Sequence, residues 1–171
     1  VHLEVMKHAK QGRDIVLIGH KGHPEVIGTL GRHPADSSTQ IVLVEDSDDI
    51  AKLELNQDAI AYVTQTTLSV DETIQLIDEL REKYPKIVGP SADDICYATQ
   101  NRQDAVKQLS LECDLVLVIG STTSSNSNRL KELAEKCGTK SYLIDGTNNI
   151  DPKALEGINA VGITAGASAP E

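Results

Sequence analysis

A chain of 171 residues with a formal net charge of −10 is long enough for a real hydrophobic core, as one large domain or two small ones. Its acidic balance excludes a general binder of DNA, RNA or anionic membrane, and none of its apolar runs approaches the ~20 residues of a membrane span. With four Tyr, no Phe and no Trp, the core has to consist of Val, Ile, Leu and Ala, which suits parallel sheets covered by helices.

The cysteines indicate the redox environment. Cys96, Cys113 and Cys137 are an odd number and form no CxxC pair. This argues against a disulfide scaffold and for a reducing, cytoplasmic compartment. The start shows no signal-peptide pattern. Because the first residue is Val1 and a helical pattern starts at once, we expect the chain to begin inside a longer gene product.

Helical and strand patterns alternate along the whole chain. In chain order, the expected elements are helix 2–10, strand 15–18, helix 24–30, strand 41–44, helix 46–53 capped by Ser47, strand 59–63, a helix capped by Ser69 and running to Tyr84, an extended stretch at 87–90, helix 94–111, strand 115–119, helix 126–137, strand 142–144, a short helix opened by Asp151-Pro152, and strand 160–163. Gly12 and Gly138 are the expected stops of two of the helices.

This order predicts an α/β fold: two similar parallel-sheet units of three layers, with helices on both faces of each sheet. We expect the units to span residues 1–92 and 93–171. Four polar stretches, GHKGHPE, TQTT, GSTTSSNSN and TAGAS, directly follow predicted strands. Ligands of such folds bind outside the carboxyl ends of the strands. Four exits rich in anion-binding side chains therefore predict one convergent site.

GSTTSSNSN leads into a helix N-terminus, where free backbone N–H groups and the helix dipole favour anions. Ser124, Ser125 and Asn126 add donors, which suits a phosphate or a diphosphate. The stretch lacks both the GK[ST] of a Walker loop and the GxGxxG of a dinucleotide site. The alternative is a capped helix with surplus polar residues.

GHKGHPEVIG holds His20, His23 and Glu25 within six residues. These side chains could bind a metal, transfer protons as a His23–Glu25 pair, donate to an anion, or be solvated loop residues. In TQTT, the hydroxyls of Thr66 and Thr67 could orient a substrate hydroxyl or could simply end a strand.

Cys96 lies near a helix start, where a thiolate is favoured, although packing is the alternative role. Ser168 of TAGAS could donate to a phosphate or begin another helix. Cys113 and Cys137 have no polar neighbours of note in the sequence, and we expect them to be structural.

Taken together, GHKGHPEVIGT, TQTTLSVDET, KIVGPSADDICYATQNRQ, SSNSNRL and VGITAGASAPE resemble the LytB-type reductases of isoprenoid synthesis, in the family's order and over the whole chain. The resemblance implies reductive removal of the allylic hydroxyl of 4-hydroxy-3-methylbut-2-enyl diphosphate, giving isopentenyl and dimethylallyl diphosphate. It also implies a 4Fe–4S cluster and an external one-electron donor of the ferredoxin or flavodoxin type, in the cytoplasm, with neither nucleic acid nor membrane as a partner.

The resemblance further implies roles for individual residues. Glu25 matches the residue that delivers protons, and Cys96 matches one cluster ligand. The implied substrate-binding residues are His23, Thr66, Thr67, Ser124, Ser125, Asn126 and Ser168. By this resemblance, Thr66 and Thr67 lie beside the substrate hydroxyl, the others contact the diphosphate, and His23 also belongs to the proton path.

Two departures from the family pattern limit this expectation. The family uses three cluster cysteines, and neither Cys113 nor Cys137 falls in a matching motif. The family's N-terminal domain, with two of those cysteines, has no counterpart in this sequence. We therefore expect the 171-residue chain by itself to be inactive. The alternatives are a non-enzymatic α/β module that binds a phosphorylated metabolite, and a metal-dependent hydrolase built on His20, His23 and Glu25.

Overall fold

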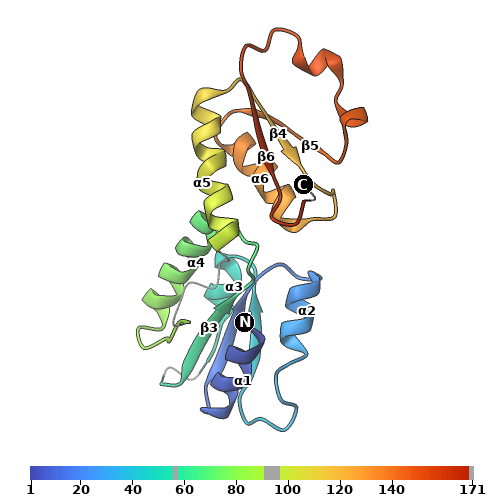
Figure 1. The fold of residues 1–171 in the computed structure, drawn as a ribbon. Coiled ribbons are helices and arrows are strands. Elements are labelled where there is room, and N and C mark those ends of the chain that lie inside the picture. The colour runs from blue at the N-terminus through green and yellow to red at the C-terminus, as the bar shows by residue number, and fades with distance from the viewer. Residues whose placement is uncertain (56–57, 91–96, 170–171) are drawn as a thin grey trace. The chain divides into compact units, whose positions relative to one another are not determined.

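The computed structural model describes residues 1–55, 58–90 and 97–169. The contacts divide the chain into two compact parts, Val1–Ile95 and Cys96–Glu171, which we call unit 1 and unit 2 (Figure 1). The expected boundary between residues 92 and 93 falls in 91–96, outside the described residues.

Helices and strands alternate in both units. Unit 1 contains α1 (His2–Lys10), β1 (Asp14–Ile18), α2 (Pro24–Leu30), β2 (Ile41–Val44), α3 (Ser47–Lys52), β3 (Ile60–Thr64) and α4 (Val70–Lys83). Unit 2 contains α5 (Tyr97–Glu112), β4 (Leu115–Ile119), α6 (Ser125–Lys136), β5 (Lys140–Ile144), the 3₁₀ turns η1 (Thr147–Asn149) and η2 (Pro152–Leu155), and β6 (Val161–Ala165).

Each unit is built on a parallel sheet of three strands, which confirms the predicted α/β fold. The strand order is β2-β1-β3 in unit 1 and β5-β4-β6 in unit 2, so that β1 and β4 are central. In each unit the chain passes from the central strand to the strand on one side of it, β2 or β5, and then to the strand on its other side, β3 or β6. The exits of β1 and β3, and likewise those of β4 and β6, are therefore neighbours at a topological switch point, where ligands of such sheets bind.

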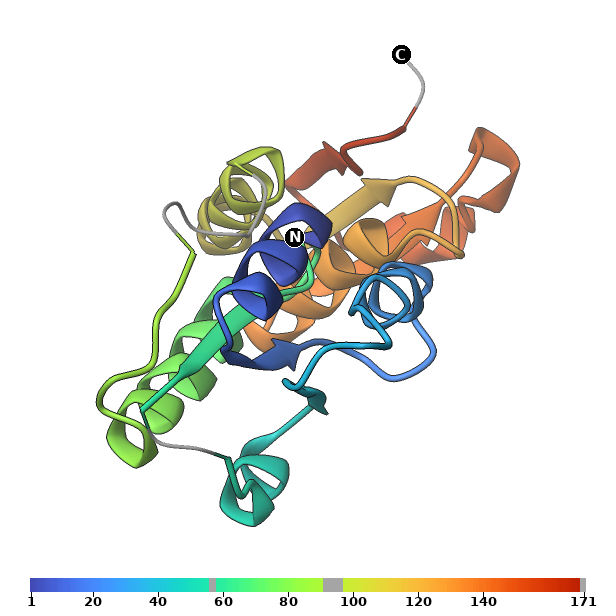
Figure 2. The ribbon, with the colours of Figure 1, turned by 90° about the horizontal axis from the view of Figure 1, so that it is seen from below.

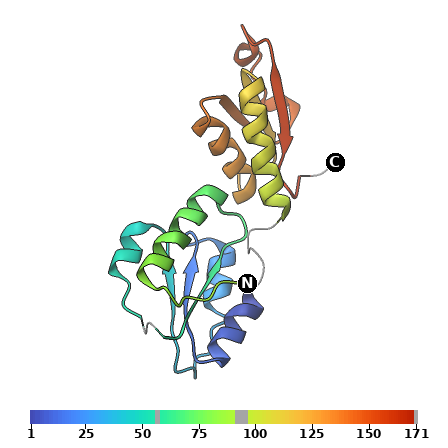
Figure 3. The ribbon, with the colours of Figure 1, turned by 90° about the vertical axis from the view of Figure 1, so that its left-hand side faces the viewer.

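Alternate residues of β1 face two different layers of helices. Ile15 and Leu17 pack with α1 and α2, whereas Val16 and Ile18 pack with α3 and α4. Figures 2 and 3 show the sheet of unit 1 between these two helix layers. Because successive side chains of β1 point to opposite faces and are buried on both, unit 1 has the three layers that the sequence predicts.

Unit 2 repeats this plan on one face only. Val116 and Val118 of β4 pack with α5 and α6. On the other face, Leu115 and Leu117 pack with Ile144 and with residues of the long β5–β6 connection that carries η1 and η2. The connection with its short turns therefore covers the second face of the unit 2 sheet, as α3 and α4 cover the second face of the unit 1 sheet.

Local signals set the ends of several helices. Ser69 caps α4 and accepts the Glu72 N–H, as the predicted capping box requires. Gly12 and Gly138 follow α1 and α6 with φ of 71° and 87°, in the left-handed region that glycine tolerates.

Other local predictions need correction. The cap of α3 is Asp46, whose Oδ1 accepts the Asp49 N–H at 3.0 Å, and not Ser47, whose hydroxyl donates to Glu79. Asp46 is placed one residue before the first helical residue, where a carboxylate reaches the N3 amide. The helix at Asp151-Pro152 is a 3₁₀ turn. In the described ranges, no helix is both long and apolar enough to span a membrane.

Candidate functional site

Glu25 and Thr66 meet at the carboxyl edge of the unit 1 sheet. Glu25 lies in the first turn of α2, after β1, and Thr66 follows β3. The Thr66 hydroxyl donates to Glu25 Oε2 at 3.0 Å, and the Thr66 N–H lies 3.2 Å from each carboxylate oxygen. A catalytic candidate and a binding candidate that are 41 residues apart in sequence thus form one hydrogen-bonded group.

A hollow of about 350 Å³ lies beside this group. Glu25 and Thr66 line it together with Val1, His2 and Leu3 at the start of α1. Both site residues are partly exposed there. A small ligand therefore has access to the Glu25 carboxylate and to the Thr66 hydroxyl.

His23 caps α2, and this role fixes what its ring can offer. Nδ1 accepts the Glu25 N–H at 3.2 Å, so that a neutral His23 carries its proton on Nε2. The second ring nitrogen is then a hydrogen-bond donor. His20 is exposed, and its backbone N–H donates to Gln65 Oε1.

Gln65 joins the two strand exits of unit 1, a role that the sequence analysis missed. Its side chain is fully buried. Oε1 accepts the His20 N–H at 3.0 Å, and Nε2 donates to the Thr67 hydroxyl at 2.9 Å. Gln65 therefore positions Thr67 and holds the GHKGH loop against the end of β3.

In unit 2, the predicted anion-binding residues gather at the N-terminus of α6. Ser124 is the N-cap, and its Oγ accepts the Ser127 N–H at 3.3 Å. Ser125 opens the helix, and Asn126 follows it in the first turn. The Asn126 side chain is 6% exposed, yet neither its Nδ2 nor its Oδ1 has a hydrogen-bond partner.

That unpartnered amide is the most informative feature of the site. Burying an amide without hydrogen bonds is unfavourable by about 1–3 kcal/mol. Buried polar groups without partners are rare in native proteins, and each calls for an explanation. An anion bound at the helix N-terminus would offer an acceptor to Nδ2.

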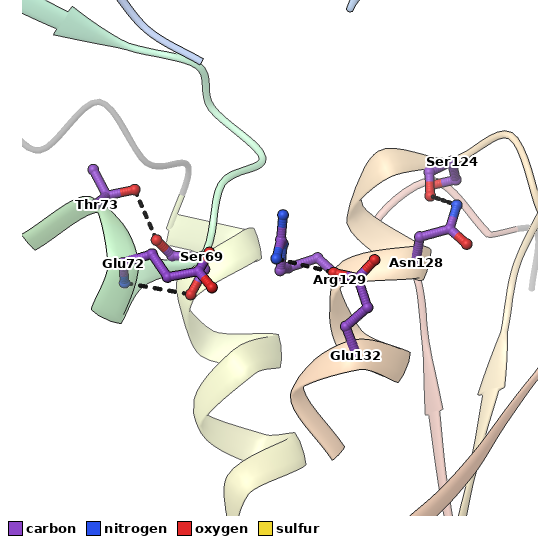
Figure 4. A network of polar contacts seen from close by, with 7 residues as sticks. All are labelled: Ser69, Glu72, Thr73, Ser124, Asn128, Arg129 and Glu132. Carbon is purple, nitrogen blue, oxygen red and sulfur yellow. Dashed lines mark hydrogen bonds and ion pairs between the residues drawn. The ribbon is translucent and has the colours of Figure 1, made fainter. Parts of the chain in front are cut away.

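Asn128 shapes the loop in front of α6 and was not predicted. Its Nδ2 donates to the carbonyl oxygens of Thr122 and Ser124, at 2.8 and 2.9 Å. Figure 4 shows the bond to Ser124, and next to it the Arg129–Glu132 ion pair of the same helix. Figure 4 also draws Ser69, the cap of α4 in unit 1. The Ser/Asn-rich stretch therefore includes both loop-building and outward-facing residues.

The last predicted binder, Ser168, lies on the neighbouring strand exit. It follows the end of β6 by three residues and is exposed. Gly166, the first residue after β6, lies close to Asn126: a Cβ there would be 3.8 Å from the Asn126 Nδ2. The β6 exit thus passes directly beside the buried amide.

The two units place their key groups at corresponding positions of one turn. Glu25 and Asn126 each follow the first residue after the central strand, Gly19 or Gly120, by six residues. The caps His23 and Ser124 correspond in the same way. One unit presents a carboxylate that already has partners, and the other presents an amide that has none.

The cysteines lie away from these groups where they can be described. Cys113 precedes β4 and Cys137 is the C-cap of α6, before β5, so both are at the amino-terminal edges of strands. Cys96 lies outside the described residues. In the part of the chain that the structure describes, no three His, Cys, Asp or Glu residues are grouped to hold a metal ion. The described residues therefore do not form a ligand set for a metal cluster.

The geometry supports two kinds of chemistry. The α6 N-terminus, with Ser124 and Asn126, offers hydrogen-bond donors to an anion. Glu25 and Thr66 form a carboxyl–hydroxyl pair through which a proton can move to or from a ligand oxygen.

Comparisons with known proteins identify the family of the chain. The family model described as "LytB protein" matches residues 1–171. The chain is 59% identical to the 4-hydroxy-3-methylbut-2-enyl diphosphate reductase of Ectopseudomonas mendocina (strain ymp) and 60% identical to that of Saccharophagus degradans, in each case over the whole chain and 55% of the relative. The chain thus spans about half the length of the curated relatives it matches.

Solved structures give the same result. The E-1-hydroxy-2-methyl-but-2-enyl-4-diphosphate reductase from Plasmodium falciparum matches with a TM-score of 0.92 and 36% identity, over 99% of this chain and 52% of that one. A second reductase structure, described as the terminal enzyme of the non-mevalonate pathway, matches with a TM-score of 0.54, 33% identity and coverage of 99% and 59%. Because the family match covers every residue, the chain belongs to the LytB family.

Proposed function

We propose that the whole protein to which this chain belongs reduces 4-hydroxy-3-methylbut-2-enyl diphosphate to isopentenyl and dimethylallyl diphosphate. Two electrons and two protons convert the allylic alcohol to an alkene and water. The relatives bear the name of this reductase, and this chain corresponds to about half of each. We infer that the chain alone binds part of the substrate without turning it over.

The observation that carries the proposal is the buried amide of Asn126, which has no hydrogen-bond partner at the start of α6. A diphosphate is the group of the substrate that needs such donors. Since the chain has a net charge of −10, attraction of the anion has to come from local donors and a helix N-terminus rather than from bulk charge. We assign Ser124, Ser125, Asn126 and Ser168 to the diphosphate.

We also assign His23 to the binding of the diphosphate. Its cap to α2 leaves a donor on Nε2, which suits an anionic oxygen. The same logic applies to both units, because each places a donor-bearing cap residue at the first helix after its central strand.

Glu25, Thr66 and Thr67 belong to the reacting end of the substrate in this proposal. Loss of an allylic hydroxyl requires a proton for the leaving oxygen. Glu25 is the proton source, and the Thr66 hydroxyl, 3.0 Å from its carboxylate, orients the substrate oxygen or relays the proton. Thr67, held by Gln65, is the second hydroxyl at this place.

The electrons require a group that this chain does not hold by itself. We propose a cluster of the 4Fe–4S type, with Cys96 as one ligand and a cytoplasmic donor of the ferredoxin or flavodoxin type. The described residues contain no group of ligands for a cluster. Cys113 and Cys137 precede β4 and β5, at the edge of the sheet opposite to the proposed site. What the chain's own residues contribute is anion binding and proton transfer.

Two other functions are less well supported. A module that only binds a phosphorylated metabolite would use the α6 site but has no need of the Glu25–Thr66 pair. A metal-dependent hydrolase needs the Glu25 carboxylate and the His23 ring as ligands, whereas three hydrogen bonds from Thr66 occupy the carboxylate and the cap occupies Nδ1 of His23.

The anion site can be tested on the chain itself by calorimetric titration with isopentenyl diphosphate in metal-free buffer. We expect binding that Asn126→Ala weakens roughly tenfold or more, because a donor to a charged oxygen is lost. Gln108→Ala, an exposed amide on α5, is the matched control and should leave the affinity unchanged. Equal affinities of all three proteins would contradict the assignment of Asn126.

The reductase activity can be tested in a chimera. The corresponding half of the Ectopseudomonas mendocina reductase is replaced by this chain, and turnover of the diphosphate is measured with a chemical reductant. An active chimera that Glu25→Gln inactivates, with substrate binding retained, supports the proposal. An inactive chimera that retains its iron, or an active one that Glu25→Gln leaves unchanged, would contradict it.

A further inference from the structure

Ser127 lies directly behind the anion site of α6, although none of the assigned roles involves it. It is 1% exposed and lies in the first turn of the helix. Both of its donors point to the same atom. The Ser127 N–H and the Ser127 hydroxyl donate to Ser124 Oγ, at 3.3 and 3.0 Å.

The surroundings hold the Ser127 hydroxyl in one place. Gly120 follows β4 and Gly166 follows β6, and a Cβ at either position would overlap with Ser127 Oγ. The hydroxyl thus lies in the space that two missing side chains leave at neighbouring strand exits. A side chain packed on two sides by backbone has little freedom to rotate.

Packing alone does not require a hydroxyl at this position. Ser127 follows Gly120 by seven residues, and in unit 1 Val26 follows Gly19 by seven residues. Val26 is 1% exposed, and it lies against Gly19 as Ser127 lies against Gly120. The same turn therefore folds with an apolar residue, and the hydroxyl in unit 2 needs another explanation.

The two hydrogen bonds determine what Ser124 can offer a ligand. A hydroxyl oxygen has two acceptor lone pairs and one O–H donor. Ser127 fills both acceptor sites of Ser124 Oγ, so that the remaining capacity of Ser124 is to donate. A hydroxyl that can only donate binds an anionic oxygen and does not bind a donor group such as an ammonium or an alcohol hydrogen.

We propose that Ser127 is a positioning residue of the anion site, which fixes the Ser124 hydroxyl as a donor and thereby raises the affinity and the selectivity of the site for fully ionised oxygens. The proposal rests on the anion-binding role proposed for α6 and adds a residue that touches no ligand. Its action goes entirely through Ser124.

A double-mutant cycle with inorganic pyrophosphate tests this on the whole 171-residue chain. We expect Ser127→Ala to weaken binding about five- to tenfold, as for the loss of one hydrogen bond. In a Ser124→Ala background, the same change should alter the affinity less than about twofold, because the atom through which Ser127 acts is gone. Equal effects of Ser127→Ala in the two backgrounds would overturn the proposal.

Ser141→Ala is the matched control. Ser141 is a second buried serine of unit 2, 3% exposed, whose hydroxyl donates to the Val116 carbonyl oxygen at 3.0 Å in the sheet. Its loss should lower the stability of the unit while pyrophosphate affinity stays the same. A loss of affinity equal to that of Ser127→Ala would show that any weakened packing in unit 2 damages the site, and would overturn the positioning role.

A second measurement needs no ligand, so that a failure of the anion site and a failure of the Ser127 proposal can be told apart. Ser124→Cys places a thiol at the cap, and its pKa is followed by the pH dependence of alkylation, located by peptide mass spectrometry. Two donors from Ser127 should hold this pKa below the ordinary cysteine value, and adding Ser127→Ala should raise it.

The outcomes then separate. If the wild-type chain does not bind pyrophosphate but the thiol pKa depends on Ser127, the anion site is wrong, and with it the effect of Ser127 on affinity, while the orientation of Ser124 by Ser127 stands. If the thiol pKa is the same with and without the Ser127 hydroxyl, the positioning role is wrong whether or not the anion binds.

Discussion

At the scale of single residues, His23 and Ser124 show how a helix cap selects the chemistry of a binding residue. Each accepts a backbone N–H of its own helix, through Nδ1 in His23 and through Oγ in Ser124. Once the acceptor is occupied, the group left for a ligand is a donor. The cap alone leaves His23 a donor, whereas the oxygen of Ser124 has a second acceptor site, which the Ser127 hydroxyl fills.

His8 gives a pH-dependent prediction at this scale. Its ring is 3% exposed, and Nδ1 accepts a hydrogen bond from Arg13 at 3.2 Å. Burial, and then the Arg13 charge, hold the pKa of His8 below its ordinary value of 6.5. The unfolded chain therefore binds this proton more readily than the folded chain does.

Because of this difference, the stability contributed by a neutral His8 is complete above about pH 6.5 and is lost as the pH falls from there towards the folded pKa. We expect the urea midpoint to fall between about pH 7.5 and pH 5.5. His8→Gln should remove part of this fall. A wild type and a variant with the same pH dependence would show that His8 does not carry it.

The cap of α3 gives a second residue-scale prediction. Asp46→Ala should lower the free energy of unfolding by about 1 kcal/mol, because the Asp49 N–H loses its acceptor. Ser47→Ala removes only an exposed bond to Glu79 and should change it by less than about 0.5 kcal/mol. Urea titration of the two variants compares them, and a larger effect of Ser47→Ala would favour the cap that the sequence predicts.

At the scale of elements, the sequence predicts more of the fold than of the site. Short runs of Val, Ile and Leu with polar exits identify the six strands of the described residues, because such runs are typical of buried parallel strands. The parallel order then places the exits of β1 and β3 side by side, which is why Glu25 and Thr66 could be expected near each other.

The individual roles within the polar exits could not be read from the sequence. In GSTTSSNSN, Asn126 has no partner, Asn128 builds the loop and Ser127 holds Ser124, although the residue types repeat. Which hydroxyl or amide faces a ligand depends on the rotation of each residue about the start of α6. In TQTT, Gln65 was overlooked because a fully buried polar residue looks like an exposed one in sequence.

The unequal covering of the two sheets gives an element-scale prediction. Tyr62 of β3 and Ile163 of β6 occupy corresponding positions, each three residues before the first residue after its strand. Tyr62 lies among α4 residues and is 6% exposed, whereas Ile163 is 63% exposed. The β6 face of unit 2 is therefore apolar surface in contact with water.

We expect Ile163→Thr to change the free energy of unfolding by less than about 0.5 kcal/mol relative to wild type, because little burial is lost. The substitution should also reduce binding of a hydrophobic dye to the chain. Tyr62→Ala should lower the free energy of unfolding by about 3–5 kcal/mol. Urea titration and dye fluorescence distinguish the two positions. A strong destabilisation by Ile163→Thr would show that this face is covered in solution.

At the scale of the whole chain, each unit has hydrophobic clusters of its own. Leu80 of α4 is fully buried among unit 1 residues, and Leu130 of α6 is fully buried among unit 2 residues. A unit with its own core can unfold as a cooperative body of its own. Each free energy of unfolding discussed above is therefore that of the unit that carries the substitution.

Leu80→Ala and Leu130→Ala are matched tests of this point, because each leaves a leucine-sized gap in one core and is expected to be unfavourable by about 2–5 kcal/mol. Hydrogen exchange followed by mass spectrometry should show faster exchange in peptides of unit 1 for Leu80→Ala and of unit 2 for Leu130→Ala. Faster exchange across both units in either variant would mean that the two cores unfold together, and that substitutions at the Glu25–Thr66 pair and at the α6 site can also affect one another through stability.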